Sequence, residues 1–240
     1  MRIATCLSGH SRNYRYNFPN IPFETDYFIS SCMESGLPNN NTTEYVSYHS
    51  QNNVTTNLAD IDDILSLYNP RIYEFSSDKY IPDEMLKFDG FKTLNNGFLT
   101  HIGMMFYRMY KANILKKEYE FDNNFKYDFV IRSRFDVKVN SVMFNKNYFY
   151  IVNTNNNFCD LFFAGDSHIM DIISECYLWF VKQDIKYLSG FKTGEDILTH
   201  YIEHLKLNIN YLNTFDVTFN KDYPIEIKSI KNGIITPIYE

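Results

Sequence analysis

Charged side chains follow a short apolar run in the middle of the chain, within residues 127–140. Residues 129–131, Phe-Val-Ile, are typical of a strand that is buried on both faces, and the chain then carries Arg132, Arg134 and Asp136. Charged groups that interrupt a buried strand are costly unless water, a ligand or a metal meets them. In open α/β sheets, ligands bind beyond the carboxyl ends of the strands. We therefore expect these three residues to lie in a cleft at that edge and to take part in the chemistry.

A second polar segment follows the first apolar run of the chain. Residues 2–7 predict a strand, and residues 8–13, Ser-Gly-His-Ser-Arg-Asn, form a loop behind it. Glycine lets a backbone approach a ligand closely, free N–H groups can meet phosphate oxygens, and Arg12 adds positive charge. The same composition is typical of an ordinary strand-to-helix turn, so both interpretations stay open. The loop lacks the Gly-Lys-Ser/Thr pattern of a P-loop NTPase.

The elements that must position these segments alternate between strands and helices. The Asn-rich residues 36–57 have too few apolar side chains for a core and predict a surface excursion. Residues 76–97 give no clear signal of helix or strand. The tail from residue 208 is strand-like. Apolar runs predict strands over 25–31, 71–75, 148–152 and 160–164. Apolar residues at helical spacing predict helices over 58–67, 99–119 and 167–181, with Asp166 as the N-cap of the third, and a last helix that opens at 192–196.

The predicted helix over 99–119 carries basic groups on one face. Tyr107 and Lys111 are four residues apart and share that face, and Arg108 stands beside them. A solvated basic edge is the simpler interpretation. The alternative is that Lys111 or Arg108 neutralises a diphosphate.

The composition limits the classes of protein to consider. The 240 residues suit one α/β domain, and a net charge of −6 argues against a general affinity for nucleic acid. The four cysteines match no metal-ligand spacing and look like reduced core residues of a cytosolic protein. No segment approaches 18 consecutive apolar residues, so we expect neither export nor a transmembrane segment.

The order of these motifs over residues 1–206 resembles that of a GT-A type glycosyltransferase. Small viral and bacterial glycosyltransferase-like proteins similarly open with Leu-Ser-Gly-x-x-Arg and carry an Arg-x-Arg-x-Asp strand end. The matching segments are Leu7-Ser8-Gly9-His10-Ser11-Arg12, Arg132-Ser133-Arg134-Phe135-Asp136, Ala164-Gly165 and Gly194-Glu195-Asp196. The resemblance implies an α/β fold, with a single Rossmann-like domain over residues 1–240 and a mixed, mainly parallel central sheet flanked by helices.

The resemblance also implies a function. The protein would transfer a sugar from a nucleotide-sugar donor, most simply a UDP- or GDP-sugar, to a hydroxyl of a glycan or other acceptor in the cytoplasm, which would be the host cytoplasm for a viral protein. Glu195 and Asp196 resemble the acidic motif that supplies a general base, with Asp196 ahead, although Thr193 and Asp196 also have the spacing of a capping box. The donor-binding residues would be Leu7, Ser8, Gly9, Arg12, Lys111, Arg132, Arg134, Asp136 and Gly165.

The metal site of the family matches this chain only in part. In GT-A enzymes an Asp-x-Asp element holds Mn²⁺ or Mg²⁺ against the donor diphosphate, and the corresponding residues here are Arg134-Phe135-Asp136. Asp136 is then the one metal ligand, where a hard cation takes several oxygens. Arg134 could contact a diphosphate directly, because a guanidinium matches phosphate geometry. An internal Arg134–Asp136 ion pair that merely ends the strand is the structural alternative.

Two other classes of protein remain as alternatives. The first is a non-catalytic carbohydrate-binding or virion-associated protein with the same fold, because a fold alone does not establish function. The second is a sulfotransferase-like enzyme that would bind a nucleotide phosphosulfate at residues 8–13. Pro19 and Pro22 disfavour it, since they leave no room for a long helix directly behind that loop.

Overall fold

A computed structural model describes most of the chain. The described residues are 1–11, 14–22, 24–35, 57–77, 80–88, 98–139, 148–154, 157–207, 209–211, 217–221, 223–226, 230–231 and 234–235. Arg12 and nearly all of the Asn-rich segment 36–57 lie outside them. The predictions made for those residues are therefore not addressed by the structure.

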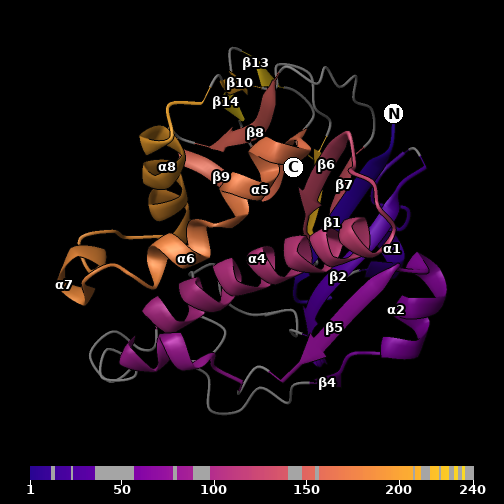
Figure 1. The fold of residues 1–240 in the computed structure, drawn as a ribbon, viewed down its shortest axis with the longest axis horizontal. Coiled ribbons are helices and arrows are strands. Elements are labelled where there is room, and N and C mark those ends of the chain that lie inside the picture. Colours follow the sequence, from indigo (N-terminus) through magenta and orange to yellow (C-terminus); the bar gives the residue numbers. More distant parts are fainter. Residues whose placement is uncertain are drawn as a thin grey trace.

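The centre of the fold is a seven-stranded mixed sheet flanked by helices (Figure 1), in the order β10-β8-β9-β6-β1-β2-β5. Every neighbouring pair is parallel except the two pairs that β9 makes with β6 and β8. The α/β class and the mainly parallel sheet predicted above are thus confirmed. The strands are β1 (Ile3–Gly9), β2 (Asp26–Cys32), β5 (Ile72–Ser76), β6 (Phe129–Ser133), β8 (Phe149–Thr154), β9 (Asn157–Asp166) and β10 (Ile209–Tyr211).

Alternating side chains divide the sheet into two faces. On one face, Cys6, Phe28 and Val130 join a core whose apolar residues include those of four helices. On the other face, Leu7 and Ile29 pack against α2 (Ile61–Tyr68). The four helices are α4 (Phe98–Asp122), α5 (Ser167–Ser174), α6 (Cys176–Phe180) and α8 (Gly194–His204).

The long helix α4 crosses the sheet face over β1 and β2 (Figure 1). The Cys6 thiol lies 3.7 Å from the carbonyl oxygen of Ala112, and Arg108 donates to the carbonyls of Ser31 and Ser76, where β2 and β5 end. Helix α4 therefore begins at the carboxyl edge of the sheet and runs back to the amino end of β6. The first half of α4 therefore lies beside the cleft that was predicted at the carboxyl edge of the sheet.

The chain leaves β6 through a turn that two buried asparagines hold. Asn17 donates to the carbonyl of Phe135 at 3.2 Å, and the Asn20 amide lies 2.6 Å from the carbonyl oxygen of Val137 and 3.3 Å from that of Arg134. Because both residues follow β1, the segment that carries Arg134 and Asp136 is fixed against the end of the first strand. The chain continues as β7 (Val137–Val139), which pairs with β11 (Val217–Lys221), itself paired with β12 (Tyr223–Glu226).

The remaining elements are short. They are α1 (Tyr14–Asn17), β3 (Glu34–Ser35), β4 (Asn57–Leu58), the 3-10 helix η1 (Asp83–Phe88), α7 (Ile185–Leu188), β13 (Ile230–Lys231) and β14 (Ile234–Ile235).

The predicted helix over 167–181 is one helix in the sequence pattern but two in the structure. Asp166 caps it as predicted, accepting a hydrogen bond from the backbone of His168. The helix breaks at Glu175, whose N–H bonds three residues back to Ile172 at 3.1 Å. This single tight turn keeps the apolar residues of both helices on one face. The spacing of apolar residues in the sequence therefore does not reveal the break. Residues 76–97, left unassigned above, include η1.

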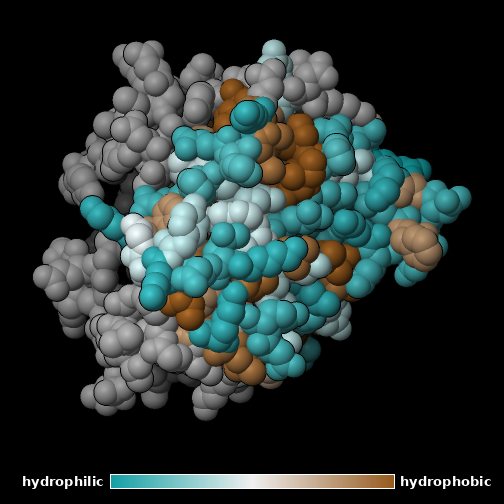
Figure 2. Space-filling view, turned by 60° about the vertical axis from the view of Figure 1, so that its left-hand side comes forward, coloured by the Kyte–Doolittle hydropathy of each residue, from teal (hydrophilic) through white to brown (hydrophobic). Residues whose placement is uncertain are grey.

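The exposed surface mixes polar and apolar residues. On the face shown in Figure 2, hydrophobic residues form separate patches between hydrophilic ones, which is ordinary for a folded protein. None of the helices in the described part of the chain combines the length and apolar character needed to cross a bilayer.

All four cysteines are free and buried, in keeping with the prediction that they are core residues.

Candidate functional site

The carboxyl ends of β1 and β6 bring the two predicted polar segments together. Cys6 pairs with Arg132 and Leu7 with Ser133 in parallel register. The side chain of Arg132 therefore points to the same face of the sheet as that of Cys6, which is the α4 face. Arg132 donates from Nε to Oγ of Ser8 at 3.1 Å, and both side chains are buried. The first loop and the central strand therefore meet at one point, as predicted.

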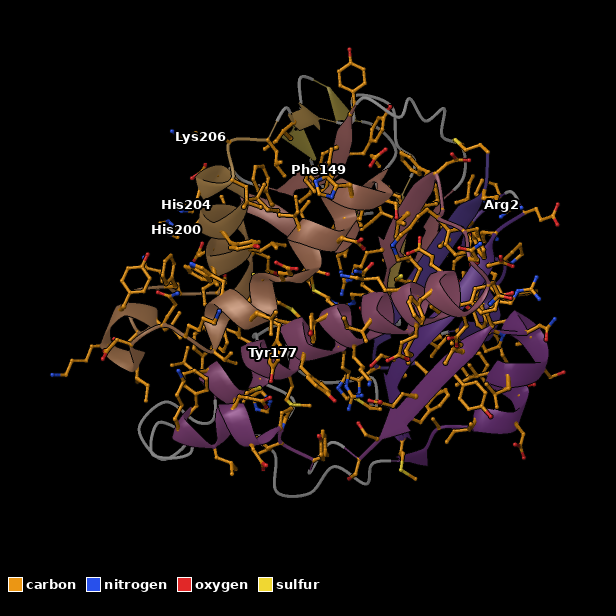
Figure 3. The ribbon with its side chains drawn as sticks, viewed as in Figure 1. Arg2, Phe149, Tyr177, His200, His204 and Lys206 are labelled. Atoms are coloured by element: carbon orange, nitrogen blue, oxygen red, sulfur yellow. The ribbon has the colours of Figure 1, made fainter. Side chains whose placement is uncertain are left out.

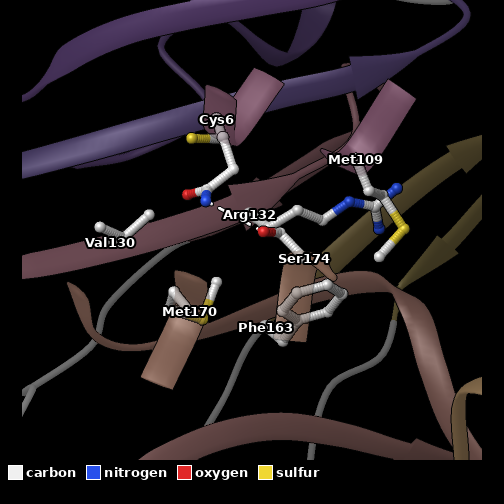
Figure 4. A pocket seen from close by; sticks show the side chains of 8 residues that line it. Cys6, Met109, Val130, Arg132, Phe163, Met170 and Ser174 are labelled. Carbon is white, nitrogen blue, oxygen red and sulfur yellow. Dashed lines mark hydrogen bonds between the residues drawn. The ribbon is translucent and has the colours of Figure 1, made fainter. Parts of the chain in front are cut away.

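The Arg132 guanidinium is buried without a full set of partners. Its carbon lies 5.4 Å from the centroid of the Phe163 ring, and burial lowers the pKa of Arg132 to about 10. Its Nη1 has no hydrogen-bond partner among the described residues. Figure 4 shows Arg132 lining a cavity with Met109 of α4 and Ser174 of α5. The cavity volume is about 10 Å³, close to the space of one water molecule.

An ion cluster lies just beyond Arg132. Arg134 makes a two-pronged ion pair with Asp136, from Nε to Oδ1 at 2.9 Å and from Nη2 to Oδ2 at 2.7 Å. Its Nη1 lies 3.6 Å from Oδ2 of Asp160 on β9. Asp136 and Asp160 are buried, and the Arg134 side chain is 18% exposed. Burial opposes the charge of Arg134, but Asp136 and then Asp160 outweigh it and raise the pKa of Arg134 above its ordinary value.

Glu195, in the first turn of α8, lies within electrostatic reach of this cluster. Burial, and secondly the negative charge of Asp160, raise the pKa of Glu195 above its ordinary value, while Arg134 opposes the shift. Helix α8 is fixed to β9 by a hydrogen bond from the Phe158 N–H to Oγ1 of Thr199 at 2.7 Å. A carboxyl group with a raised pKa beside charged partners is a frequent mark of a functional site.

Asp196 has a different position from its neighbour Glu195. Its carboxylate accepts hydrogen bonds from the backbone N–H groups of Lys192 at 3.0 Å and Thr193 at 2.9 Å. Thr193 in turn accepts from the Asp196 N–H at 3.1 Å. These contacts form the complete capping box that the spacing predicts. The geometry therefore favours a helix-capping role for Asp196 and leaves Glu195 next to the cluster.

Glycines shape the approach to the cluster. Gly9 ends β1 with φ of +100°, a backbone conformation that favours glycine, and a Cβ there would meet nothing within 4 Å among the described residues. With respect to the described residues, space is thus open beside the end of β1. Gly194, the first residue of α8, lies so close to α4 that a Cβ would come within 2.9 Å of the Met105 methyl group. The absence of a side chain lets the α8 start approach α4.

Other predicted donor-binding residues lie away from the cluster. The Leu7 side chain is buried in the core on the α2 face. Lys111 pairs with Glu74 of β5 at 3.4 Å. Gly165 pairs with Val130, toward the amino end of β6. The structure thus brings together Ser8, Gly9, Arg132, Arg134, Asp136 and Glu195 at the carboxyl edge of the sheet.

Asp160 is the residue of this site that sequence reasoning missed. It stands in the run Phe158-Cys159-Asp160-Leu161-Phe162, where a carboxylate interrupts apolar residues. The same anomaly identified Arg132 and Arg134 in the central strand. A charged residue inside a predicted buried strand was therefore the available signal.

Among the described residues, histidines and further acids do not gather around Asp136 as metal ligands do. Figure 3 shows His200 and His204 on the outer side of α8, pointing away from the sheet. In the part of the chain that the structure describes, no three side chains of His, Cys, Asp or Glu gather as metal ligands do.

Two comparisons of the sequence give no relative to set beside this geometry. No protein-family model matches the chain, and no curated protein shows significant sequence similarity to it. The fold and the site therefore define an α/β domain with a mixed sheet and a charged cluster at the carboxyl edge, where α/β proteins commonly bind ligands.

Proposed function

We propose that the chain is a glycosyltransferase that transfers a sugar from a nucleotide-sugar donor to a hydroxyl of a glycan or other acceptor. The observation that carries the proposal is the meeting of Arg132, Arg134 and Glu195 with the open end of β1 at one edge of the sheet. Guanidinium groups suit a diphosphate, and a carboxylate suits an acceptor hydroxyl. The mixed sheet supports the proposal, since it is compatible with the GT-A resemblance.

In this proposal, the donor diphosphate binds at the end of β1. Among the described residues, Gly9 leaves space for phosphate oxygens beside the backbone, and the preceding residue, Ser8, accepts a hydrogen bond from Arg132. The guanidinium has a free donor in Nη1 within the described residues. Because the guanidinium is buried, its charge acts on a nearby phosphate with little screening by water.

Glu195 is the general base of the proposed transfer. The acceptor hydroxyl loses its proton to the Glu195 carboxylate as its oxygen forms a bond to the anomeric carbon. The bond from that carbon to the phosphate oxygen breaks, and its electron pair leaves with the nucleoside diphosphate. The raised pKa of Glu195 supports this role, because a more basic carboxylate accepts a proton more readily.

Further observations bear on the location and on the alternatives. The buried, free thiols support a reducing compartment such as the cytoplasm. The helix behind the β1 loop, α1, has four residues, which continues to disfavour a sulfotransferase-like enzyme with a long phosphate-binding helix there. A non-catalytic carbohydrate-binding protein differs from the proposed enzyme in one respect that can be measured: it would bind a sugar or glycan but would not turn over a nucleotide sugar.

The binding part of the proposal is tested by thermal unfolding with UDP, GDP, CMP, dTDP and ADP and the corresponding nucleotide sugars. One nucleotide class at a hundredfold excess over its Kd should add about 2.7 kcal/mol of stability, which raises the Tm of a chain of this size by roughly 5 to 10 °C. The shift should shrink in Arg132→Lys, which keeps the charge but loses the guanidinium fork. It should persist in Lys111→Met, because Lys111 pairs with Glu74 elsewhere.

Two results would contradict the proposed donor site. One is an unchanged Tm with every nucleotide and nucleotide sugar. The other is a shift that survives in Arg132→Lys and disappears in Lys111→Met, which would move the nucleotide to the outer face of α4.

A further inference from the structure

The GT-A resemblance implies a divalent metal ion at positions 134–136, where the side chains present can be tested as its ligands. Both carboxylate oxygens of Asp136 are within 2.9 Å of Arg134 nitrogens. A divalent cation such as Mn²⁺ or Mg²⁺ binds several oxygen ligands, and a ligand set with a guanidinium in its centre does not suit it. The residues at positions 134–136 therefore do not fit the metal of the family.

The position of Arg134 explains this mismatch. Its guanidinium contacts Asp136 after β6 and lies 3.6 Å from Asp160 of β9, so one cation sits between carboxylates from two strands. Carboxylates that share a buried site cannot both stay ionised without a positive charge between them. We propose that Arg134 is a resident cation that occupies the place of a divalent metal and makes the site independent of metal ions.

The surroundings hold the guanidinium in that place. Nε and Nη2 bind the two oxygens of Asp136 in the planar, two-pronged geometry that fixes an arginine most firmly. The Arg134 N–H donates to the carbonyl of Leu161 at 3.1 Å, and Asn20 contacts the Arg134 carbonyl. A metal ion entering the wild-type site would have to break this buried pair. That cost lowers the affinity by a factor on the order of a hundred or more.

Removing the guanidinium should convert the cluster into a metal site. In Arg134→Met, the aliphatic stem keeps much of the packing, but Asp136 and Asp160 lose their shared cation. Two carboxylate groups with water, and Glu195 nearby, then provide oxygen ligands for a hard cation. In Arg134→Lys, the ammonium group retains the positive charge, so this variant is the matched control.

The experiment is a Mn²⁺ titration followed by electron paramagnetic resonance, which counts bound ions without any nucleotide or activity. Wild type and Arg134→Lys should bind no Mn²⁺ at the cluster. Arg134→Met should bind one Mn²⁺ per chain at least a hundredfold more tightly than wild type, and Arg134→Met/Asp160→Asn should lose that binding. Circular dichroism with and without Mn²⁺ reports folding, and an Arg134→Met chain that needs Mn²⁺ to fold also supports the proposal.

Two results overturn the proposal. The first is a wild-type Mn²⁺ site that disappears in Asp136→Asn. The second is an Arg134→Met protein that binds no Mn²⁺, whether it folds or stays unfolded with the ion present. The expectation that wild-type sugar transfer survives EDTA rests in addition on the proposed function. If no transfer is found, the Mn²⁺ titrations still decide the role of Arg134.

Discussion

Two buried clusters in this protein place one cation between two carboxylates, and they differ in the polar groups that lie next to them. Under α4, Lys116 contacts Glu120 at 3.2 Å and Asp171 at 2.9 Å. At the carboxyl edge of the sheet, Arg134 has the same relation to Asp136 and Asp160.

The charged groups of the Lys116 cluster contact one another and neighbouring polar groups directly. The ammonium group also binds Oγ of Ser167 at 2.9 Å, and Glu120 accepts hydrogen bonds from the Tyr127 N–H and from Lys126. The side chains of Lys116 and Glu120 have no exposed surface. Such a network holds α4, α5 and the start of β6 together, and within the described residues none of its buried side-chain atoms lacks a hydrogen-bond partner.

The Arg134 cluster differs from the Lys116 cluster in its neighbours. Beside it, Nη1 of Arg132 lacks a partner among the described residues, and Glu195 has a raised pKa. Buried charge is common to both clusters and does not by itself distinguish them. Incomplete partners at the carboxyl edge of a sheet, together with a shifted pKa, are the more informative signs.

The largest expected effect on stability comes from the Lys116 cluster. Lys116→Met leaves Glu120 and Asp171 without their common cation and should lower the free energy of unfolding by about 3 to 5 kcal/mol. The matched control is Lys126→Met, because Lys126 contacts the same Glu120 with a side chain that is 68% exposed. That change should cost about 1 kcal/mol or less. Urea unfolding measures both.

A Lys116→Met protein as stable as wild type would remove the contrast between the two clusters. So would a Lys116→Met protein that unfolds normally but loses nucleotide binding, since the Lys116 cluster would then belong to the site.

A smaller effect separates the two neighbouring acids of α8. Thr193→Ala removes the side-chain cap of the helix and should cost about 0.5 to 2 kcal/mol of stability. Asp196→Asn keeps an oxygen that can accept from the Lys192 and Thr193 N–H groups, so its cost should be smaller. Turnover per folded molecule should stay the same in both variants. A loss of turnover in Asp196→Asn at unchanged stability would return the general base to Asp196.

Local patterns in the sequence were sufficient to predict the elements that carry the site. Strands β1, β2 and β5 each begin and end within two residues of the predicted segments, because a buried strand needs only a short apolar run and a polar boundary. The capping box at Thr193 was also predictable, since it involves residues three positions apart.

The contacts between distant segments were not predictable in the same way. Asp160 reaches Arg134 only because β9 pairs antiparallel with β6, and no local pattern specifies that pairing. Lys111 could be placed on a helix face but not against Glu74, which belongs to a strand 37 positions earlier (111 − 74). The choice between Glu195 and Asp196 likewise depended on which side of α8 faces β9.

The central claim is that the cluster at the carboxyl edge is a reactive site with Glu195 as its base. It is tested most directly by the pH dependence of kcat/KM for nucleotide-sugar turnover in wild type and in Glu195→Gln. A general base acts when deprotonated, so wild-type activity should fall as pH drops through the raised pKa of Glu195, above the ordinary carboxyl range. Glu195→Gln should be slower by about 10² to 10⁴ and should lack that acidic limb. A Glu195→Gln protein with wild-type rates and an unchanged pH profile would contradict the claim.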